Sequence, residues 1–335
     1  MDPRISVVIP AFNRQGAVGR AIASVLGQTC QDFEIIVVDD GSTDATVSAV
    51  AAFGDPRINL IRHDRNRGGS AARNSGIGAA VAPYVAFLDS DDEWLPTKLE
   101  RQLEVFERSD DLLGLVYTGA ERVFPDGSIS RYIPRPHVDL PRALLIANVI
   151  GETSLGMVRR NALEAIGGFD ESLPSCQDLD LWQRISERFR IDAVPEVLVK
   201  IANGSDSGRI STNVRRAMAG RELYCRKHRE KMTHRGVLHL FLRDSGWCQQ
   251  RQARDTRLAR RFYRESLAVN PLAPLTYMLL LSTYVPATWL DHLARCKRSI
   301  AKLLGFGPEA YFAENSSRLT STGKLERNAP NDSAA

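Results

Sequence analysis

The sequence predicts an α/β fold in which a mostly parallel sheet carries helices on both faces. Short apolar runs rich in Val and Ile occupy residues 5–9, 34–38, 57–61 and 84–88, and such runs are typical of strands buried on both faces. Helix-like segments stand between these runs, so strand and helix alternate over about 90 residues. In such a sheet the ligand crevice lies beyond the carboxyl ends of the strands.

Each helix between these strands has its own signal. Apolar residues recur at three- and four-residue spacing from Val18 to Leu26, which predicts one buried stripe. The carboxylate of Asp44 can cap a helix that runs to Phe53. Residues 70–80 are rich in Ala and Gly, which predicts a helix packed closely on the sheet.

The pattern is looser after the fourth strand. Residues 99–106 predict one more amphipathic helix, and residues 112–118 predict a strand. Asp126-Gly127 between apolar stretches predicts a hairpin. From Val214 onward the sequence is largely helical, so we expect a helical extension after the sheet.

Charge and polarity divide the chain into three regions. Residues 215–264 carry 15 Lys and Arg residues against 4 Asp and Glu residues, a local charge of +11 in a chain whose total is +4. Residues 313–335 are polar with few apolar residues, so we expect disorder there. We therefore expect a first domain over 1–212, a basic and apolar helical extension over 213–312, and a disordered tail.

The extension contains a strongly apolar segment between Asn270 and Leu290 that has no charged residue. Pro271, Pro274 and Pro286 argue against a continuous membrane-spanning helix. The basic residues on either side would be attracted to anionic lipid headgroups by ~1 kcal/mol per charge, which favours peripheral attachment to a membrane surface. The alternative is a helical hairpin packed on the first domain. Nucleic acid is not an expected partner, because no recognisable binding module is present.

Cysteine usage and the N-terminal residues indicate a compartment. The five cysteines include no C-x-x-C pair, which favours free thiols in a reducing environment. Residues 1–4 lead directly into the first predicted strand, without the charged and apolar leader of a signal peptide. We expect a cytoplasmic protein, attached peripherally to the cytoplasmic face of a membrane.

Carboxylates gather at the predicted strand ends. Asp39-Asp40 follows the second strand, residues 89–92 (Asp-Ser-Asp-Asp) follow the fourth, and Asp178 and Asp180 begin a later helix. Several carboxylates near one crevice repel each other unless a cation relieves the repulsion. Mg²⁺ and Mn²⁺ prefer oxygen ligands and are often held by one or two carboxylates plus substrate phosphates. The sequence therefore predicts a divalent cation at this crevice.

Phosphate-binding groups stand nearby in the sequence. Arg67 and Arg73 flank a Gly68-Gly69 turn, and guanidinium groups pair with phosphates through two parallel hydrogen bonds. No G-x-G-x-x-G follows the first strand, which disfavours a dinucleotide-dependent oxidoreductase, and no P-loop motif is present. Acids, arginines and a glycine turn together indicate a site for a metal-bound diphosphate.

Five motifs in this order and spacing resemble those of family 2 glycosyltransferases of the GT-A fold, over roughly residues 4–212. They are Ser6-Val-Val-Ile-Pro-Ala-Phe-Asn-Arg14, Val37-Val-Asp-Asp-Gly-Ser-Thr-Asp44, Ala72-Arg-Asn-Ser-Gly76, Phe87-Leu-Asp-Ser-Asp-Asp92 and Gln177-Asp-Leu-Asp-Leu-Trp182. The resemblance implies a Rossmann-like GT-A catalytic domain over 1–212.

The resemblance also implies where the donor base would bind. The loop Pro10, Ala11 and Phe12 would lie against the nucleobase, and Asp40 would form a hydrogen bond with it. Arg73 would stand beside the base and the diphosphate.

Further residues acquire roles by the same resemblance. Asp89 and Ser90 would approach the ribose and diphosphate, and Asp91 would reach a Mn²⁺ or Mg²⁺ ion. Asp178 would be the catalytic base. Gln177 stands where the family's acidic pair usually begins with Glu.

The resemblance therefore implies an inverting, metal-dependent glycosyltransferase. We expect it to move a sugar from a nucleotide donor, a UDP-sugar, to a glycan or lipid-linked saccharide in cell-surface polysaccharide synthesis. The alternative is a noncatalytic subunit that binds nucleotide sugars or serves in assembly, for which Gln177 is the sequence support.

Overall fold

The structure is a computed structural model that describes residues 2–124, 127–201, 214–285 and 318–319. Its centre is one ten-stranded sheet with the order β10-β7-β6-β8-β4-β1-β2-β3, in which β9 pairs with β6 and β5 pairs with β9. The strands are β1 (Ile5–Ala11), β2 (Phe33–Asp39), β3 (Ile58–Arg62), β4 (Tyr84–Phe87), β5 (Glu93–Trp94), β6 (Leu113–Val123), β7 (Ile129–Tyr132), β8 (Gly156–Arg159), β9 (Arg190–Ile201) and β10 (Arg318–Leu319).

The four predicted N-terminal strands are confirmed and are parallel. β1 lies between β2 and β4, and β2 continues to β3. Val7 and Ile9 of β1 are fully buried, as the apolar run predicts for a strand covered on both faces. The carboxyl ends of β1, β2 and β4 therefore meet at one edge of the sheet, where the acidic motifs begin.

The second half of the sheet is mixed rather than parallel. β8 is antiparallel to both β4 and β6, and β9 is parallel to β6. The predicted hairpin is confirmed, because β6 and β7 are antiparallel and Gly127 has a φ of +78° in the turn. Parallel and antiparallel strands thus share the sheet, and the predicted α/β class holds.

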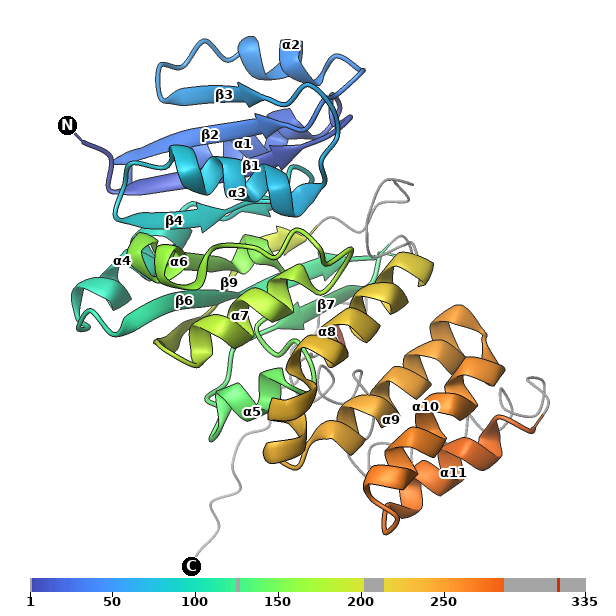
Figure 1. Cartoon of the computed structure of the whole chain (residues 1–335). Coiled ribbons are helices and arrows are strands. Elements are labelled where there is room, and N and C mark those ends of the chain that lie inside the picture. Colours follow the sequence, from blue (N-terminus) through green and yellow to red (C-terminus); the bar gives the residue numbers. More distant parts are fainter. Residues whose placement is uncertain (1, 125–126, 202–213, 286–317, 320–335) are drawn as a thin grey trace, which may run out of the picture.

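Helices cover the sheet on both sides (Figure 1). Those of the first 201 residues are α1 (Val18–Leu26), α2 (Thr46–Ala51), α3 (Gly69–Ala79), α4 (Lys98–Glu107), α5 (Leu140–Leu144), the short 3-10 helix η1 (Thr153–Leu155), α6 (Arg160–Ile166) and α7 (Gln177–Ser186). The predicted stripe of α1 is buried, and Asp44 accepts a hydrogen bond from the Thr46 backbone N–H at the start of α2. The predicted close packing of α3 is confirmed at Gly76, where an added Cβ would lie 2.3 Å from Val8 Cγ1.

The helical extension follows as α8 (Val214–His234), α9 (Leu238–Cys248), the π-helical turn η3 (Gln249–Ala253), α10 (Thr256–Val269) and α11 (Pro274–Ser282). α8 and α9 share the hydrophobic core of the sheet domain. Tyr224 of α8 is fully buried and donates a hydrogen bond to the Leu144 carbonyl at 3.0 Å. The predicted boundary between 212 and 213 lies outside the described residues, as does most of the predicted tail over 313–335.

The described part of the apolar segment 270–290 forms α11, which packs on α10. Ala259, Tyr263 and Leu279 form a small second core there. Within residues 2–124, 127–201 and 214–285, no helix is both long and apolar enough to cross a membrane. Figure 1 shows α9, α10 and α11 grouped beyond α8, away from the parallel strands.

Candidate active site

A cleft of about 670 Å³ opens at the carboxyl ends of β1, β2 and β4 and is bounded on its far side by α7, α8 and α9. The residues that acquire site roles from the family resemblance all line this one cleft. They are Pro10, Ala11, Phe12, Asp40, Arg73, Asp89, Ser90, Asp91 and Asp178. The structure therefore brings together carboxylates that are far apart in the sequence, as the strand-end argument requires.

Asp40, which directly follows β2, lies in the wall of the cleft near the end of β1. Its Oδ2 accepts a hydrogen bond from the Gly68 backbone N–H at 2.7 Å, and its Oδ1 accepts one from the Arg67 N–H at 2.9 Å. His63, which the sequence did not place, lies with Nδ1 2.7 Å from Asp40 Oδ1 and Nε2 2.9 Å from Ser75 Oγ. Asp40 thus fixes the glycine turn at the start of α3 while lining the cleft.

The two arginines that flank the glycine turn have different environments. Arg73 is buried in the cleft wall, whereas the exposed Arg67 guanidinium lies 3.8 Å from Glu171 and does not line the cleft. Arg73 Nη2 lies 2.5 Å from Asp89 Oδ1, and its guanidinium stacks 5.5 Å from the centre of the Phe169 ring. Among the described residues, the buried Nε of Arg73 has no hydrogen-bond partner. Of the two, only Arg73 is placed to meet a ligand in the cleft.

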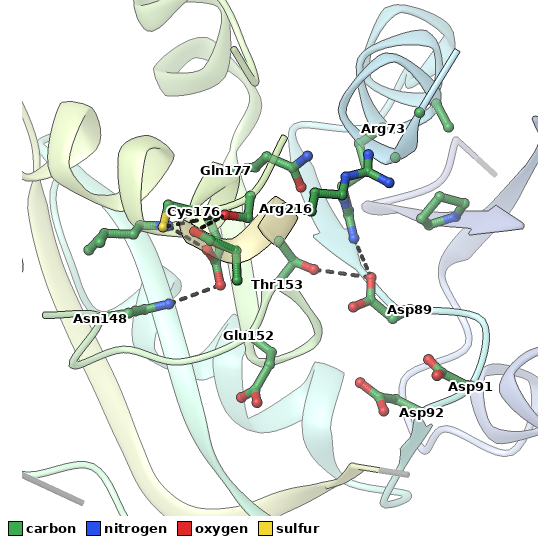
Figure 2. Close-up of a pocket in the computed structure, with 18 of the residues that line it drawn as sticks. Arg73, Asp89, Asp91, Asp92, Asn148, Glu152, Thr153, Cys176, Gln177 and Arg216 are labelled. Atoms are coloured by element: carbon green, nitrogen blue, oxygen red, sulfur yellow. Dashed lines mark hydrogen bonds and ion pairs between the residues drawn. The ribbon is translucent and has the colours of Figure 1, made fainter. Parts of the chain in front are cut away.

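Ser154 of the 3-10 helix η1 forms hydrogen bonds with the acidic loop after β4. The Ser154 hydroxyl donates to Asp92 Oδ2 at 2.7 Å and accepts from the Asp89 backbone N–H at 3.0 Å. Burial raises the pKa of the Asp92 carboxyl well above its usual value, and the charges of Asp89, Asp91 and Glu152 raise it further. Figure 2 shows Asp89, Asp91 and Asp92 on one side of the cleft, with Glu152 facing them. The loop thus concentrates negative charge.

This donor set fits a hard divalent cation in its chemistry. Carboxylate oxygens are the preferred ligands of Mg²⁺ and Mn²⁺, and a cation would relieve the repulsion that raises the pKa of Asp92. No group of three or more His, Cys, Asp or Glu side chains in the described ranges is arranged to hold a metal by itself. A cation at this site would therefore be held by one or two protein carboxylates together with the phosphates of a bound ligand.

Asp178 lies at the opposite wall, in the first turn of α7. Its Oδ2 accepts a hydrogen bond from Asn148 Nδ2 at 2.9 Å, and its Oδ1 accepts one from the Leu179 backbone N–H at 2.8 Å. Burial raises the pKa of the Asp178 carboxyl to about 6, against the lowering effect of the Leu179 hydrogen bond. A carboxylate with this pKa is largely ionised at neutral pH yet basic enough to accept a proton.

Gln177 and Asp180, the neighbours of Asp178, have other functions. Gln177 Nε2 donates to the Leu173 carbonyl at 2.9 Å. Asp180 is fully buried and forms an ion pair with Arg184 at 2.7 Å and a hydrogen bond with His228 of α8 at 2.8 Å. Asp180 therefore joins α7 to α8.

Sequence patterns did not reveal several groups in the far wall. They are Arg122, Asn148, Glu152, Thr153, Arg216, Arg221 and Asp244. Most come from irregular segments or from the helical extension, where no periodicity or spacing marks them. The one available signal was the high arginine content of the extension, which predicted charge but no position.

Comparison with known proteins identifies this arrangement. Residues 6–167 match the model of the family described as glycosyl transferase family 2. Residues 6–167 therefore form a family 2 glycosyltransferase domain within this chain. The predicted family resemblance is therefore confirmed.

Relatives within family 2 cover part of the chain. An uncharacterized glycosyltransferase of Rickettsia felis is 32% identical over 214 residues, covering 62% of this chain and 35% of the relative. The succinoglycan biosynthesis protein ExoO of Rhizobium meliloti is 40% identical over 155 residues, covering 44% of this chain and 43% of ExoO. The chain thus spans between about a third and a half of the length of these curated relatives.

Solved structures show the same fold at low sequence identity. S. aureus TarS 1-349 in complex with UDP-GlcNAc has a TM-score of 0.62 at 18% identity, covering 85% of this chain and 89% of the TarS 1-349 chain. Mannosyltransferase PcManGT from Pyrobaculum calidifontis, in complex with GDP-Man and Mn²⁺, has a TM-score of 0.58 at 20% identity, covering 93% and 86%. The family 2 domain therefore has the Rossmann-like GT-A fold predicted from the sequence.

Proposed function

We propose that this family 2 protein catalyses inverting transfer of a sugar from a nucleotide sugar to a hydroxyl of a glycan or lipid-linked saccharide in polysaccharide synthesis. One observation carries the proposal: Arg73, the acidic loop 89–92 and the partly desolvated carboxylate of Asp178 line the same cleft. The relation to a succinoglycan biosynthesis protein supports the polysaccharide context.

The donor would occupy the β1 side of the cleft. Pro10, Ala11 and Phe12 would flank the nucleobase, with Asp40 at its edge. Arg73 would pair with the diphosphate, because its buried Nε has no hydrogen-bond partner among the described residues and needs an acceptor.

Ser90 and the acidic loop would complete the donor site. Asp89 and Ser90 would approach the ribose and diphosphate, and Asp91 would hold Mn²⁺ or Mg²⁺. When bound, such a cation would supply electrostatic stabilisation of the negative charge that develops on the leaving diphosphate.

The acceptor would approach from the α7 and α8 side. Asp178 would take the proton of the attacking hydroxyl while the acceptor oxygen bonds to the anomeric carbon. The bond between that carbon and the diphosphate oxygen breaks, and its electron pair leaves with the nucleoside diphosphate. Attack opposite the leaving group inverts the anomeric configuration.

An assay of nucleoside diphosphate release tests the proposal. The protein is incubated with a nucleotide-sugar donor and a mixture of membrane-derived acceptors. Asp178→Asn should lower turnover by about 10²- to 10⁴-fold, the usual contribution of a general base, with nucleotide affinity nearly unchanged. Asp91→Ala should instead abolish metal-dependent nucleotide binding. Tight nucleotide-sugar binding by the wild type, with no turnover on any acceptor, would favour the noncatalytic subunit.

The donor nucleotide is addressed separately by thermal shift. We propose UDP, because TarS of the same fold was solved with UDP-GlcNAc. UDP-sugars with Mn²⁺ should raise the melting temperature, since ligands that bind only the native state stabilise it by mass action. A larger shift with GDP- or dTDP-sugars would replace UDP in the proposal.

We further propose that α11 contacts the anionic cytoplasmic face of a membrane. α11 is apolar all round, yet Tyr277, Met278 and Leu281 are exposed on its outer face. Tyr284 continues this face, and Arg260 of α10 stacks 3.9 Å from the centre of its ring. Apolar side chains beside arginines match the boundary between acyl chains and anionic headgroups.

Sedimentation with vesicles tests this contact. The full chain should bind vesicles containing phosphatidylglycerol and release at high salt, and bind pure phosphatidylcholine vesicles weakly. Leu281→Glu should reduce binding at least several-fold. Val81→Glu is the matched control, because Val81 is 62% exposed on the sheet domain. Equal binding by Leu281→Glu, or self-association through α11 without vesicle binding, would contradict the proposal.

A further inference from the structure

The side chain of Asn148 is fully engaged between its own loop and Asp178. Its Oδ1 accepts hydrogen bonds from the backbone N–H groups of Gly151 at 2.9 Å and Ile150 at 3.3 Å. Its Nδ2 donates to the Gly151 carbonyl at 3.0 Å and to Asp178 Oδ2 at 2.9 Å. Figure 2 shows Asn148 with a dashed line that marks a hydrogen bond of its side-chain nitrogen.

This network fixes which end of the Asn148 amide faces Asp178. The backbone N–H groups of Ile150 and Gly151 both point at one end of the amide, so that end must be the oxygen, Oδ1. The ionised Asp178 carboxylate can only accept hydrogen bonds, so it needs a donor. The amide nitrogen must therefore face Asp178. Trp182 anchors the same loop, since its Nε1 donates to the Gly151 carbonyl at 3.1 Å.

We propose that Asn148 is the positioning residue of the catalytic base: it fixes the orientation of the Asp178 carboxylate and favours the ionised form. This inference rests on the proposed role of Asp178. Gln177, beside Asp178 in sequence, donates instead to the Leu173 carbonyl. The polar contact that orients the base thus comes from a loop 30 residues earlier in the chain.

The charges around Asp178 explain why such a contact is needed. Burial raises the pKa of Asp178, and the carboxylates of Glu152 and Asp89 raise it further, whereas Arg73 lowers it. Cys176, just before α7, and Arg216 and Arg221 of α8 also line the cleft. A hydrogen bond donated to the ionised carboxylate opposes the effect of burial.

Two substitutions separate the proposed role from simple support of the loop. Asn148→Ala removes every bond of the side chain. Asn148→Asp keeps an oxygen for the Ile150 and Gly151 N–H groups but places a second carboxylate against Asp178. Both should raise the pKa of Asp178, and Asn148→Asp should do so more, because it adds repulsion between like charges.

The pKa is measured directly by ¹³C NMR titration of the Asp178 carboxyl carbon, assigned by its loss in Asp178→Asn. Asn148→Ala should raise the pKa by about one unit, since a hydrogen bond to a charged group has that effect. The acid limb of the kcat/KM profile should move by the same amount, with donor KM nearly unchanged. Asn161→Ala, at an exposed position of α6, is the control.

The outcomes are distinct. A pKa of Asp178 unchanged in both folded variants would overturn the inference, as would a uniform loss of rate at every pH. If Asn148→Ala does not fold, the titration of Asn148→Asp decides. If Asp178→Asn keeps full turnover, the proposed base is wrong, whereas a shifted NMR titration would still show that Asn148 controls the ionisation of Asp178.

Discussion

Arg73 of α3 and Asp89 after β4 form an ion pair in the cleft, with Nη2 and Oδ1 2.5 Å apart. Thr153 also donates to this Asp89 oxygen, at 3.2 Å. Two residues proposed for the donor site are therefore partners of each other in the free protein. A bound diphosphate would accept hydrogen bonds from the same guanidinium group that pairs with Asp89. The ion pair fixes the orientation of that group before the ligand binds.

We expect Arg73→Ala to weaken nucleotide-sugar binding by about 10- to 100-fold, because a charge-assisted hydrogen bond contributes roughly 1.5–3 kcal/mol. Arg67→Ala is the matched control, since Arg67 flanks the same glycine turn but does not line the cleft. Isothermal titration with UDP and Mn²⁺ measures both. Equal effects of the two substitutions would show that general positive charge, rather than the position of Arg73, attracts the donor.

The rate should depend on pH through Asp178. A base must be ionised, and burial raises its pKa to about 6, so kcat/KM should be flat near pH 7 and fall as the pH drops through 6. At pH 5 the expected rate is about a tenth of the plateau. Initial rates between pH 4.5 and 8 measure this fall in rate, whose midpoint should lie at about pH 6. A midpoint near the ordinary carboxyl value would mean that the base is solvated during turnover.

Asp180→Asn should destabilise the protein while leaving the cleft residues in place. Burial by itself raises the pKa of Asp180, but the hydrogen bond from His228 and the charges of Arg184 and Lys227 lower it to about 2. A lowered pKa contributes stability above the unfolded value, and that stability is lost as the pH falls through about 2. We expect a loss of about 2 kcal/mol at pH 7 that shrinks below about pH 4.

Urea denaturation at pH 7 and pH 3 measures this difference. Glu164→Gln is the control, because Glu164 is 61% exposed and its pair with Arg160 at 3.8 Å should contribute little. A loss for Asp180→Asn that is equal at both pH values would assign the effect to packing rather than to charge.

Two glycines of α3 should respond oppositely to alanine. An added Cβ at Gly76 would lie 2.3 Å from Val8 Cγ1 in the core, so Gly76→Ala should cost about 1–3 kcal/mol of unfolding free energy. Gly78 has open space around the same position, so Gly78→Ala should stabilise α3 by about 0.5–1 kcal/mol. Denaturation midpoints compare the two, and loss of stability in both would contradict the packing argument.

Local patterns in the sequence predicted the parallel half of the fold. A buried strand is marked by a short run of β-branched residues, and an amphipathic helix by apolar residues at three- and four-residue spacing. These signals are local, so β1 to β4, α1 and α3 could be located from their own residues. β8 and β9 were not predicted, because their pairing with β6 depends on partners distant in the chain. The mixed character of the sheet followed from those pairings.

The acidic and basic motifs that line the cleft could likewise be named from the sequence, because parallel strands place their carboxyl ends at one edge. Asp40, Asp91 and Asp178 were expected to share a cleft, and they line the same one. Asp180, which the sequence placed in the same acidic cluster as Asp178, does not line the cleft. Its pairing with His228 of α8 shows that it joins two helices.

The sequence by itself determined the class of fold, the family and the chemical types of residue at the strand ends, since these depend on periodicity and on order along the chain. Only the tertiary structure decided that Asn148 donates a hydrogen bond to Asp178, that Ser154 bonds to the acidic loop and that α8 lines the far wall of the cleft. Each of those contacts joins segments separated by tens of residues without any repeating pattern. Their geometry is set by how the helices pack on the sheet, which no local signal encodes.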